Sequence, residues 1–330
     1  MDHQPVSIVT GSTGFVGSHL VDYLLEQGHN IKCIIRKSSD RKWIKGKAVE
    51  IFDSGLFDQQ KLEEIVKEAD YIFHVAGVVK SKTSEGYFRG NVTTTYNLLK
   101  AVSKSKTKLK RFVLVSSQTA AGPSVNNVVV NEKMEVNPIT TYGRSKAEAE
   151  EVTKMYKDEI PITICRAPAV YGERDTEIFL VFKTFKKGLM TLVGFNKKQV
   201  SLIHVRDLVR GIYLAATSEK SVGETYFISS DKFYDWDTVA DHLEKIFDKK
   251  ALRLKIPHPV VYMIAGISQF GAKFSSKPAT FNLEKAKDFV QEAWTCDISK
   301  AQRELGFQPE ISLEDGLKRT IEWYKENNWL

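Results

Sequence analysis

Long hydrophobic runs and cysteines are both scarce in this chain. No apolar stretch among its 330 residues reaches the roughly 20 residues of a membrane-spanning helix, and residues 1–5 do not resemble a secretory leader. The 3 cysteines are widely spread, and Cys33 and Cys165 fall in apolar stretches that we expect to be buried strands. We therefore predict no disulfide framework, no metal site and a reducing, cytoplasmic environment.

The chain also lacks the pattern typical of nucleic-acid binding. Its formal net charge is +7, with lysines concentrated in residues 37–47 and 100–111. A nucleic-acid surface combines basic side chains with interleaved aromatic ones, but residues 104–111 contain no aromatic residue. This basic run is typical of a solvated helix end, so we expect no nucleic-acid partner.

The first half of the chain is rich in alternating strand-like and helix-like segments. The short connections between them imply right-handed crossovers and a parallel, doubly wound α/β sheet. In such a sheet, ligands bind at the carboxyl ends of the strands. The expected strands are 6–10, 30–36, 48–52, 70–75, 111–117 and 160–166, and the expected helices are 15–27, 59–67, 87–104 and 141–157.

Three glycines lie between the first expected strand and the first expected helix. Gly11 permits a tight turn, Gly14 lets backbone approach a pyrophosphate, and Gly17 lets the helix pack closely on the strand. The helix N-terminus offers free N–H groups and a positive dipole to the phosphates. A strand, a glycine loop and a helix in this order predict a dinucleotide-binding site.

The alternating pattern loosens after residue 172. A helix at 205–217 and a strand at 225–229 are expected to rejoin the sheet. We predict a dinucleotide-binding domain of residues 1–172 and about 204–230, interleaved with a smaller, mainly helical substrate-binding domain of about 173–203 and 231–330. Further helices are expected at 177–187, 237–248, 259–270, 299–305 and 313–327.

A tyrosine and a lysine four residues apart are candidates for acid–base chemistry. Tyr142 and Lys146 lie near the start of an expected helix, so their side chains share one face about one turn apart. The ammonium would favour the phenolate and lower the tyrosine pKa toward working pH. Tyr96 and Lys100 have the same spacing, but they lie mid-helix. We favour the Tyr142 pair because it follows Ser117, whose hydroxyl ends an expected strand and can hydrogen-bond a substrate oxygen.

These motifs belong to an ordered series that extends along essentially the whole chain. The series comprises residues 10–17, 74–77, 91–92, 116–117, 142–146, 166–172, 204–208 and 297–307, followed by Trp323 and Tyr324. It resembles the extended short-chain dehydrogenases/reductases of the NAD-dependent epimerase/dehydratase group, which have a Rossmann-type fold. Within that group the chain is similar to dihydroflavonol reductases and 3β-hydroxysteroid dehydrogenases.

The resemblance implies a role for each candidate residue. Ser117 would orient the substrate oxygen, Tyr142 would transfer a proton, and Lys146 would lower the tyrosine pKa and bind the nicotinamide ribose. Asn91 would either support the proton relay or hold a helix end. The implied cofactor-binding residues are Gly11, Thr13, Gly14, Phe15, Gly17, Arg36, Asp53, Ala76, Asn91, Lys146 and Pro168.

The expected cofactor is NADP(H), with NAD(H) as the alternative. Arg36 ends the second expected strand, where NAD enzymes usually place an acidic residue on the ribose 2′-hydroxyl. An arginine there can pair with a 2′-phosphate, although it could also be an ordinary surface residue. The acidic residue that usually holds the adenine is replaced by Gly55, so Asp53 would reach the adenine only through a lengthened loop.

The expected substrate side differs from that of nucleotide-sugar enzymes. Ala169 and Val200 stand where those enzymes often carry Asn and Arg. A diphosphate needs donors and positive charge, so this loss favours a small or apolar carbonyl or alcohol, acted on by hydride transfer. Lys197, Lys198 and Arg206 could supply charge from elsewhere, so a nucleotide-sugar epimerase or dehydratase is the alternative. A non-catalytic dinucleotide-binding regulator is the third hypothesis, and a homodimer is compatible with all three.

The C-terminal part is expected to close over the nicotinamide and set specificity. Aromatic and aliphatic side chains from this part would form an apolar wall and a lid, although each could instead be core. The expected wall residues are Phe179, Phe182, Phe195 and Leu202, and the expected lid residues are Tyr262, Phe270 and Phe274.

Overall fold

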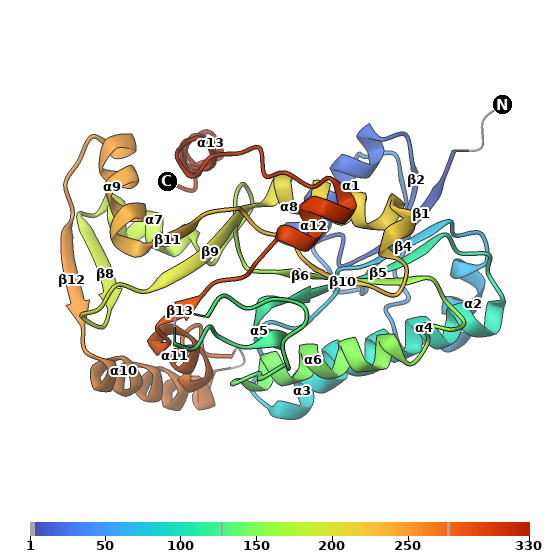
Figure 1. The fold of residues 1–330 in the computed structure, drawn as a ribbon, viewed down its shortest axis with the longest axis horizontal. Coiled ribbons are helices and arrows are strands. Elements are labelled where there is room, and N and C mark those ends of the chain that lie inside the picture. The colour runs from blue at the N-terminus through green and yellow to red at the C-terminus, as the bar shows by residue number, and fades with distance from the viewer. Residues whose placement is uncertain (1–3, 127, 276–277) are drawn as a thin grey trace.

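A computed structural model describes residues 4–126, 128–275 and 278–330, and a seven-stranded sheet forms its larger part (Figure 1). The strand order is β10-β6-β5-β4-β1-β2-β3, and every neighbouring pair is parallel. This confirms the doubly wound α/β prediction, including the late strand that rejoins the sheet. The strands are β1 (Val6–Thr10), β2 (Asn30–Ile34), β3 (Val49–Phe52), β4 (Tyr71–His74), β5 (Arg111–Ser117), β6 (Ile162–Ala167) and β10 (Thr225–Phe227).

Helices cover both faces of this sheet. In Figure 1, α1 (Phe15–Glu26), α8 (Val205–Thr217) and α12 (Ser299–Leu305) lie above the sheet, and α2 (Gln59–Val66), α4 (Thr94–Ser105) and α6 (Thr141–Lys154) lie below it. Successive residues of β1 face opposite layers: Val9 packs into the upper core and Ile8 into the lower one. A strand buried on both faces is apolar along its length, which is why these strands are visible in the sequence.

The helix expected over 87–104 consists of three elements. These are α3 (Ser84–Phe88), a π-helical turn η1 (Arg89–Thr93) and α4. The π turn surrounds the buried Asn91. π turns inside helices are frequent at functional sites, but apolar periodicity does not reveal them.

The other end of the molecule contains two small sheets. The expectation of a mainly helical region there missed these strands, because they are short and pair across long sequence separations, such as β8 with β12 and β9 with β13. One sheet has the order β11-β9-β13, with β7 also on β9, and the other is the parallel pair β12-β8. The strands are β7 (Ala169–Tyr171), β8 (Leu189–Val193), β9 (Gln199–His204), β11 (Phe233–Asp235), β12 (Leu252–Ile256) and β13 (Ala293–Trp294).

Helices pack around these small sheets. A separate core cluster includes Phe182, Phe185, Leu243 and Ile321. Residues 296–307, by contrast, return to the upper core of the large sheet, where Phe307 is fully buried. The chain therefore passes repeatedly between the two ends. The helices of this end are α7 (Phe179–Lys186), α9 (Trp236–Phe247), α10 (His258–Gly271), the short η3 (Ala272–Phe274), α11 (Leu283–Val290) and α13 (Leu313–Glu326). Two further short helices, α5 (Gln118–Ala121) and η2 (Glu219–Ser221), lie beside the large sheet.

Candidate active site

The glycine loop between β1 and α1 has no room for side chains. Gly11 has a φ of +70°, and a Cβ atom there would lie 2.7 Å from the Ala76 nitrogen. A Cβ atom on Gly17 would lie 2.2 Å from the Gly11 oxygen. Gly14 precedes α1 in extended conformation, without a side-chain cap and without an acidic residue in the first turn. The first N–H groups of α1 are therefore available to an anion, and the loop fits the pyrophosphate of a dinucleotide.

A buried histidine fixes the neighbouring strand end. The Thr10 hydroxyl is 2.8 Å from His74 Nδ1 and accepts a 3.1 Å hydrogen bond from the Ala76 nitrogen. His74 Nε2 is 3.0 Å from the Thr95 hydroxyl. Burial lowers the His74 pKa to about 3, so the ring is neutral and holds the loop after β4 beside the glycine loop.

Asn91 ties the same loop to α6. Its Oδ1 accepts a 2.6 Å hydrogen bond from the Val78 nitrogen, while Nδ2 donates to the Val78 oxygen and, at 2.8 Å, to the Ser145 hydroxyl. These contacts place Asn91 between the end of β4 and the helix that carries Tyr142. Of the two alternatives raised from the sequence, they match the holding of a helix rather than a proton relay.

Ser117 and Tyr142 meet where β5 ends and α6 begins. Ser117 Oγ accepts hydrogen bonds from the Thr119 nitrogen at 3.2 Å and the Thr119 hydroxyl at 2.9 Å. Burial raises the Tyr142 pKa to about 12, and a hydrogen bond with Ser117 opposes that rise. The phenol is therefore protonated at neutral pH, as a proton donor to a carbonyl oxygen requires.

Lys146 lies one turn further along α6 and is almost fully buried. Its ammonium donates a 2.8 Å hydrogen bond to the Val115 oxygen. It also lies 3.9 Å from where a Cβ atom on Gly77 would be, at the end of β4. Burial lowers the Lys146 pKa to about 8, and Glu150 opposes this effect. The Tyr142 pKa is thus raised by burial, whereas Lys146 was expected from the sequence to lower it.

A buried ion pair fixes α6 against the sheet. Glu150, on α6, pairs with Arg166 of β6 at 2.7 Å and accepts a hydrogen bond from Ser116 of β5. The side chains of Glu150 and Arg166 are both nearly inaccessible to solvent. Removal of one partner would leave a buried charge unpaired, so this contact holds the Tyr142 helix in register with the strand end.

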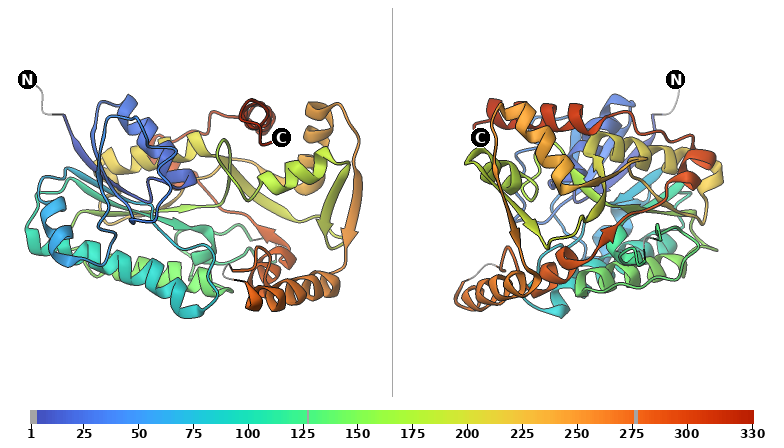
Figure 2. Two further views of the ribbon diagram at one scale, coloured as in Figure 1. Left: turned by 180° about the vertical axis from the view of Figure 1, so that it is seen from behind. Right: turned by 60° about the vertical axis from the view of Figure 1, so that its left-hand side comes forward.

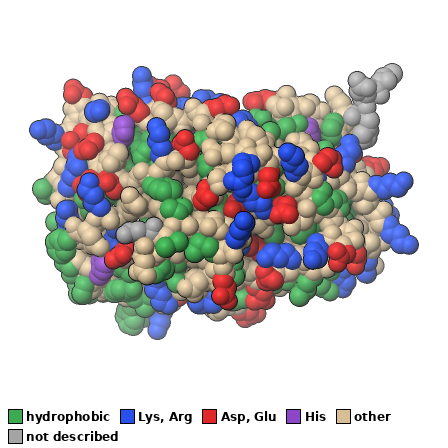
Figure 3. Space-filling view, in the orientation of Figure 1, with side chains coloured by type: hydrophobic (Ala, Val, Ile, Leu, Met, Phe, Trp, Pro, Cys, Tyr) green, Lys and Arg blue, Asp and Glu red, His purple; other side chains and the backbone are tan. Residues whose placement is uncertain are grey.

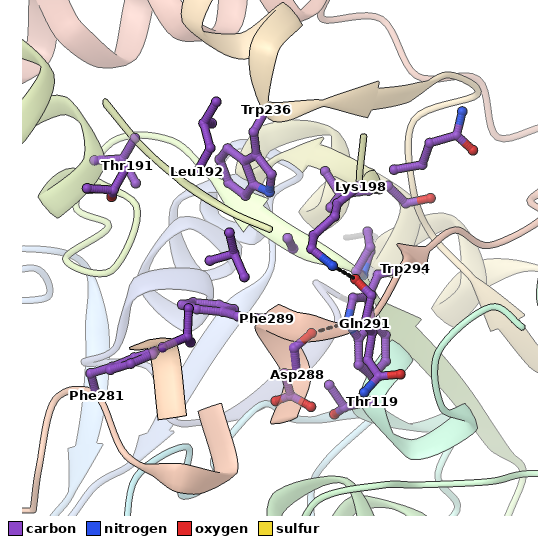
Figure 4. A pocket seen from close by; sticks show the side chains of 18 of the residues that line it. Thr119, Thr191, Leu192, Lys198, Trp236, Phe281, Asp288, Phe289, Gln291 and Trp294 are labelled. Carbon is purple, nitrogen blue, oxygen red and sulfur yellow. Dashed lines mark hydrogen bonds between the residues drawn. The ribbon is translucent and has the colours of Figure 1, made fainter. Parts of the chain in front are cut away.

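A cavity of about 520 Å³ opens beside Ser117 and Thr119 and extends into the C-terminal part (Figure 4). Ala169 and Val200, which stand in place of the polar residues of nucleotide-sugar enzymes, both line it, as does Pro168. Its walls are mainly aliphatic and aromatic. They include Val181, Met190, Leu192, Trp236, Ile256, Val261, Ile264, Phe281, Phe289 and Trp294.

The aromatic wall differs from the one expected. Phe182 is fully buried in the core of the small sheets, and Leu202 is buried in the same cluster. Phe179 packs on Tyr324 and Trp329. The remaining three expected aromatics of α10 and its C-terminal end, together with Phe195, lie on the surface. Their side chains are exposed, namely Phe195, Tyr262, Phe270 and Phe274.

Asp288 is a polar residue of the cavity that sequence reasoning missed. It lies on α11, and Figure 4 shows it at the same end of the pocket as Thr119. Its Oδ1 is buried without a hydrogen-bond partner among the described residues. Burial raises its pKa to about 7, and its charge contributes to the raised Tyr142 pKa. Asn282, which caps α11 by accepting from the Lys285 nitrogen, was the available signal for this helix.

Two candidate residues lie at the adenosine end of the expected cofactor site. Arg36 follows β2 and is exposed, and its backbone forms an isolated bridge with Ser54. Asp53 is also exposed and forms a 3.3 Å ion pair with Arg41. Such an exposed pair is weak and can be exchanged for ligand contacts.

Comparison with known proteins identifies the family and the fold. Residues 7–229 match the model of the NAD dependent epimerase/dehydratase family. The chain is 26% identical to the ceramide reductase of Caulobacter vibrioides over all of its length and 97% of that protein. It is 23% identical to the decarboxylating sterol-4-alpha-carboxylate 3-dehydrogenase of Dictyostelium discoideum, over 94% of this chain and 98% of the relative. A UDP-glucose 4-epimerase from Thermotoga maritima, solved with UDP-glucose, has a TM-score of 0.81 at 22% identity and covers 98% of this chain and 99% of its own.

Proposed function

Because the chain belongs to the NAD-dependent epimerase/dehydratase family, and is thus an NAD(P)-binding enzyme, we propose that it interconverts a carbonyl and an alcohol on an apolar, lipid-like substrate. The observation that carries this proposal is the cavity of about 520 Å³ with aliphatic and aromatic walls beside Ser117. Burial of apolar substrate area against such walls is the main source of affinity available there.

The cavity is poorly equipped for a nucleotide diphosphate. Lys198 is the one cation among its lining residues, and its ammonium donates to the Val290 and Gln291 oxygens at 2.7 and 2.9 Å. Lys197 is exposed and pairs with Asp235, and Arg206 pairs with Glu173. These three were the residues that could have compensated for Ala169 and Val200. A diphosphate in this cavity would lack the arginine fork that usually binds it.

Two of the relatives are named for a ceramide and a sterol, and the chain covers nearly the full length of both. A putative UDP-glucose 4-epimerase is equally similar, at 26% identity, so the cavity and not the relatives carries the proposal. The similarity to the UDP-glucose epimerase, at 22% identity, supports the fold alone.

The proposed chemistry needs one proton and one hydride. The nicotinamide, when bound, supplies or accepts the hydride at the substrate carbon. Tyr142 donates its phenolic proton to the carbonyl oxygen as the carbonyl becomes an alcohol, and takes it back in the reverse direction. The hydroxyls of Ser117 and Thr119 orient that oxygen. The positive charge of Lys146 would stabilise the phenolate that remains after Tyr142 gives up its proton. The same ammonium would bind the nicotinamide ribose.

We further propose NADP(H) as the preferred cofactor. Arg36 follows β2, at the position where an acidic residue would repel a 2′-phosphate. Arg41 lies near the same strand end and can leave its exposed pair with Asp53 to meet the phosphate. Gly11, Thr13, Gly14, Phe15, Gly17, Ala76 and Pro168 would complete the cofactor site.

A chain-length series tests the proposal. Reduction of ketones of increasing acyl length is followed by the absorbance of NADPH, with UDP-glucose as the comparison substrate. The cavity predicts that kcat/KM rises with apolar length until about 520 Å³ is filled. Turnover of UDP-glucose without activity on any ketone would refute the proposal and favour the epimerase alternative.

A further inference from the structure

The most unusual surface of the molecule is α10. This helix of 14 residues contains no Asp, Glu, Lys or Arg, yet it lies at the edge of the molecule in all three views (Figures 1 and 2). Its exposed side chains include Met263 (57% exposed), Ile267 (67%) and Phe270 (61%), and Phe274 just beyond it is 82% exposed. Apolar side chains gather in the same region of the space-filling view (Figure 3).

Packing accounts for only one stripe of α10. Val261 and Ala265, one turn apart, are buried against Ala286 of α11. The exposed residues lie on the remaining surface, at the spacing of successive helical turns. A surface helix of a water-exposed protein would carry charged residues there. Contiguous exposed apolar surface of this kind marks an interaction site. We refer to Met263, Ile264, Ile267, Phe270, Phe274 and Phe289 as the apolar patch.

The apolar patch is continuous with the wall of the active-site cavity. Ile264 and Phe289 belong to both: each lines the cavity and each is exposed at the surface. Phe289 stacks on Phe281, which also lines the cavity, with ring centroids 5.6 Å apart. An apolar molecule could therefore pass from the patch to the cavity along apolar side chains throughout.

A lysine lies beyond each end of α10. Lys255 precedes α10 and Lys273 follows it, and both are exposed. Lys273 lies 5.8 Å above the ring of Phe270, so its ammonium is at the rim of the patch. An uncharged helix with aromatic and aliphatic side chains and a lysine beyond each end is the pattern of a helix that lies in the interface of an anionic bilayer.

We propose that the apolar patch docks on an anionic lipid surface and that the lipid substrate enters the cavity from there. This inference rests on the proposed function for the identity of the substrate. None of the helices in the described part of the chain could span a membrane. The lysines face the headgroups and the aromatics lie among the acyl chains.

Vesicle sedimentation tests the surface. The full-length protein is mixed with vesicles of phosphatidylcholine alone, or of equal parts phosphatidylcholine and phosphatidylglycerol. We expect it to sediment with the anionic vesicles and to be released by high salt. The double variant Ile267→Glu/Phe270→Glu should lose roughly tenfold or more of the vesicle-bound fraction. The control is Met155→Glu/Val222→Glu, which places the same charges on two exposed apolar residues beside the large sheet. This variant should bind the vesicles as the parent does.

Several results would overturn the proposal. These are absence of the parent from both vesicle pellets, equal losses in the two double variants, or a dimer in size-exclusion chromatography that only the Ile267/Phe270 variant dissociates. NADPH oxidation with a short, water-soluble ketone should be the same in the parent and that variant, which shows that the fold and the active site are intact. Vesicle binding without turnover of any ketone would refute the proposed function and leave the lipid-binding surface standing.

Discussion

The large sheet with its covering helices, here called the nucleotide half, differs in construction from the small sheets with their helices, here called the substrate half. The large sheet has seven parallel strands buried between helix layers, with candidate functional groups at its strand ends and on α6, and close backbone contacts such as Gly17 on Gly11 leave little freedom. The substrate half consists of short strands and helices around an apolar cavity, with α10 exposed at its edge. In the proposed function, the large sheet and α6 supply the chemistry, and the part around the cavity selects the substrate.

The largest expected effect tests the chemistry of the nucleotide half. Tyr142→Phe removes the proton donor but keeps the ring, so turnover should fall by about two to four orders of magnitude while cofactor affinity stays unchanged. Steady-state kinetics and a cofactor titration measure the two quantities. Tyr96→Phe is the control, because Tyr96 is exposed on α4, and equal losses in both variants would show that the wrong tyrosine was chosen.

A smaller effect tests the rigidity of the glycine loop. The Cβ atom of Gly17→Ala would lie 2.2 Å from the Gly11 oxygen, a backbone atom that cannot move without opening the loop. We expect a loss of about 1–3 kcal/mol in the free energy of unfolding, together with weaker dinucleotide binding. The control is Gly266→Ala on α10, where a Cβ atom meets nothing within 4 Å and alanine should not destabilise. Unfolding of both variants by denaturant measures the free energy of unfolding. Equal stability of the two variants would contradict the account.

The next prediction tests whether the substrate occupies the apolar cavity. Ala169→Asn with Val200→Arg restores the polar groups typical of nucleotide-sugar enzymes at two lining positions. We expect kcat/KM for an apolar ketone to fall roughly 10- to 100-fold, because a charged side chain fills an apolar pocket. NADP binding should stay intact, since the substitutions lie outside the glycine loop. An undiminished rate would mean that the substrate does not occupy this cavity.

Cofactor choice is the next test. Arg36→Ala should weaken NADP binding by about tenfold, the value of one charge-assisted hydrogen-bonded pair, and leave NAD binding nearly unchanged. Titration of both cofactors by fluorescence measures this. If the parent binds NAD more tightly than NADP, the proposed preference is wrong.

The smallest effect concerns pH. The folded-state pKa of Asp288 is raised from 3.8 to about 7, so the folded protein holds a proton that the unfolded chain releases above pH 4. This group therefore makes the wild type less stable as pH rises from about 4 to 7. Asp288→Asn has no ionisable group at this position, so its Tm should rise relative to that of the wild type as pH increases over this range.

Three charged groups on its own helix influence Asp288, namely Glu284, Lys285 and Lys287, and it also lies near Tyr142. The control is a charge outside this set. Lys318→Gln removes an exposed charge on α13 and should leave the pH dependence of Tm nearly as in the wild type. A Tm difference between Asp288→Asn and wild type that is constant from pH 5 to 8 would show that Asp288 does not titrate there.

The two halves also differed in how much the sequence could predict. The helix expected over 205–217 matches α8, and the strand expected over 111–117 matches β5. Both were predictable because elements that pack between layers carry apolar residues in a regular pattern. Ser117, Ala169 and Val200, which the motifs placed on the substrate side, line one cavity.

The remaining features depend on contacts distant in sequence. Strands β8 and β12 pair across about 60 residues, so the pairing that makes them a sheet is not visible in either local segment. Asp288 could not be assigned to the cavity before α11 was known to pack beside α6, where Glu284 accepts a hydrogen bond from the Thr141 nitrogen. Strand pairing and helix docking place these residues, and the periodicity of the local sequence predicts neither.

The central claim is that this active site performs net hydride transfer on an apolar carbonyl. The most direct measurement is the stoichiometry of a single reaction: equivalents of NADPH consumed per mole of alcohol formed from a long-chain ketone. The account predicts one equivalent for the parent, and for Tyr142→Phe the same ratio at a rate lower by about two to four orders of magnitude. Conversion of UDP-glucose into its epimer without net change in the cofactor, and without any ketone reduction, would contradict it.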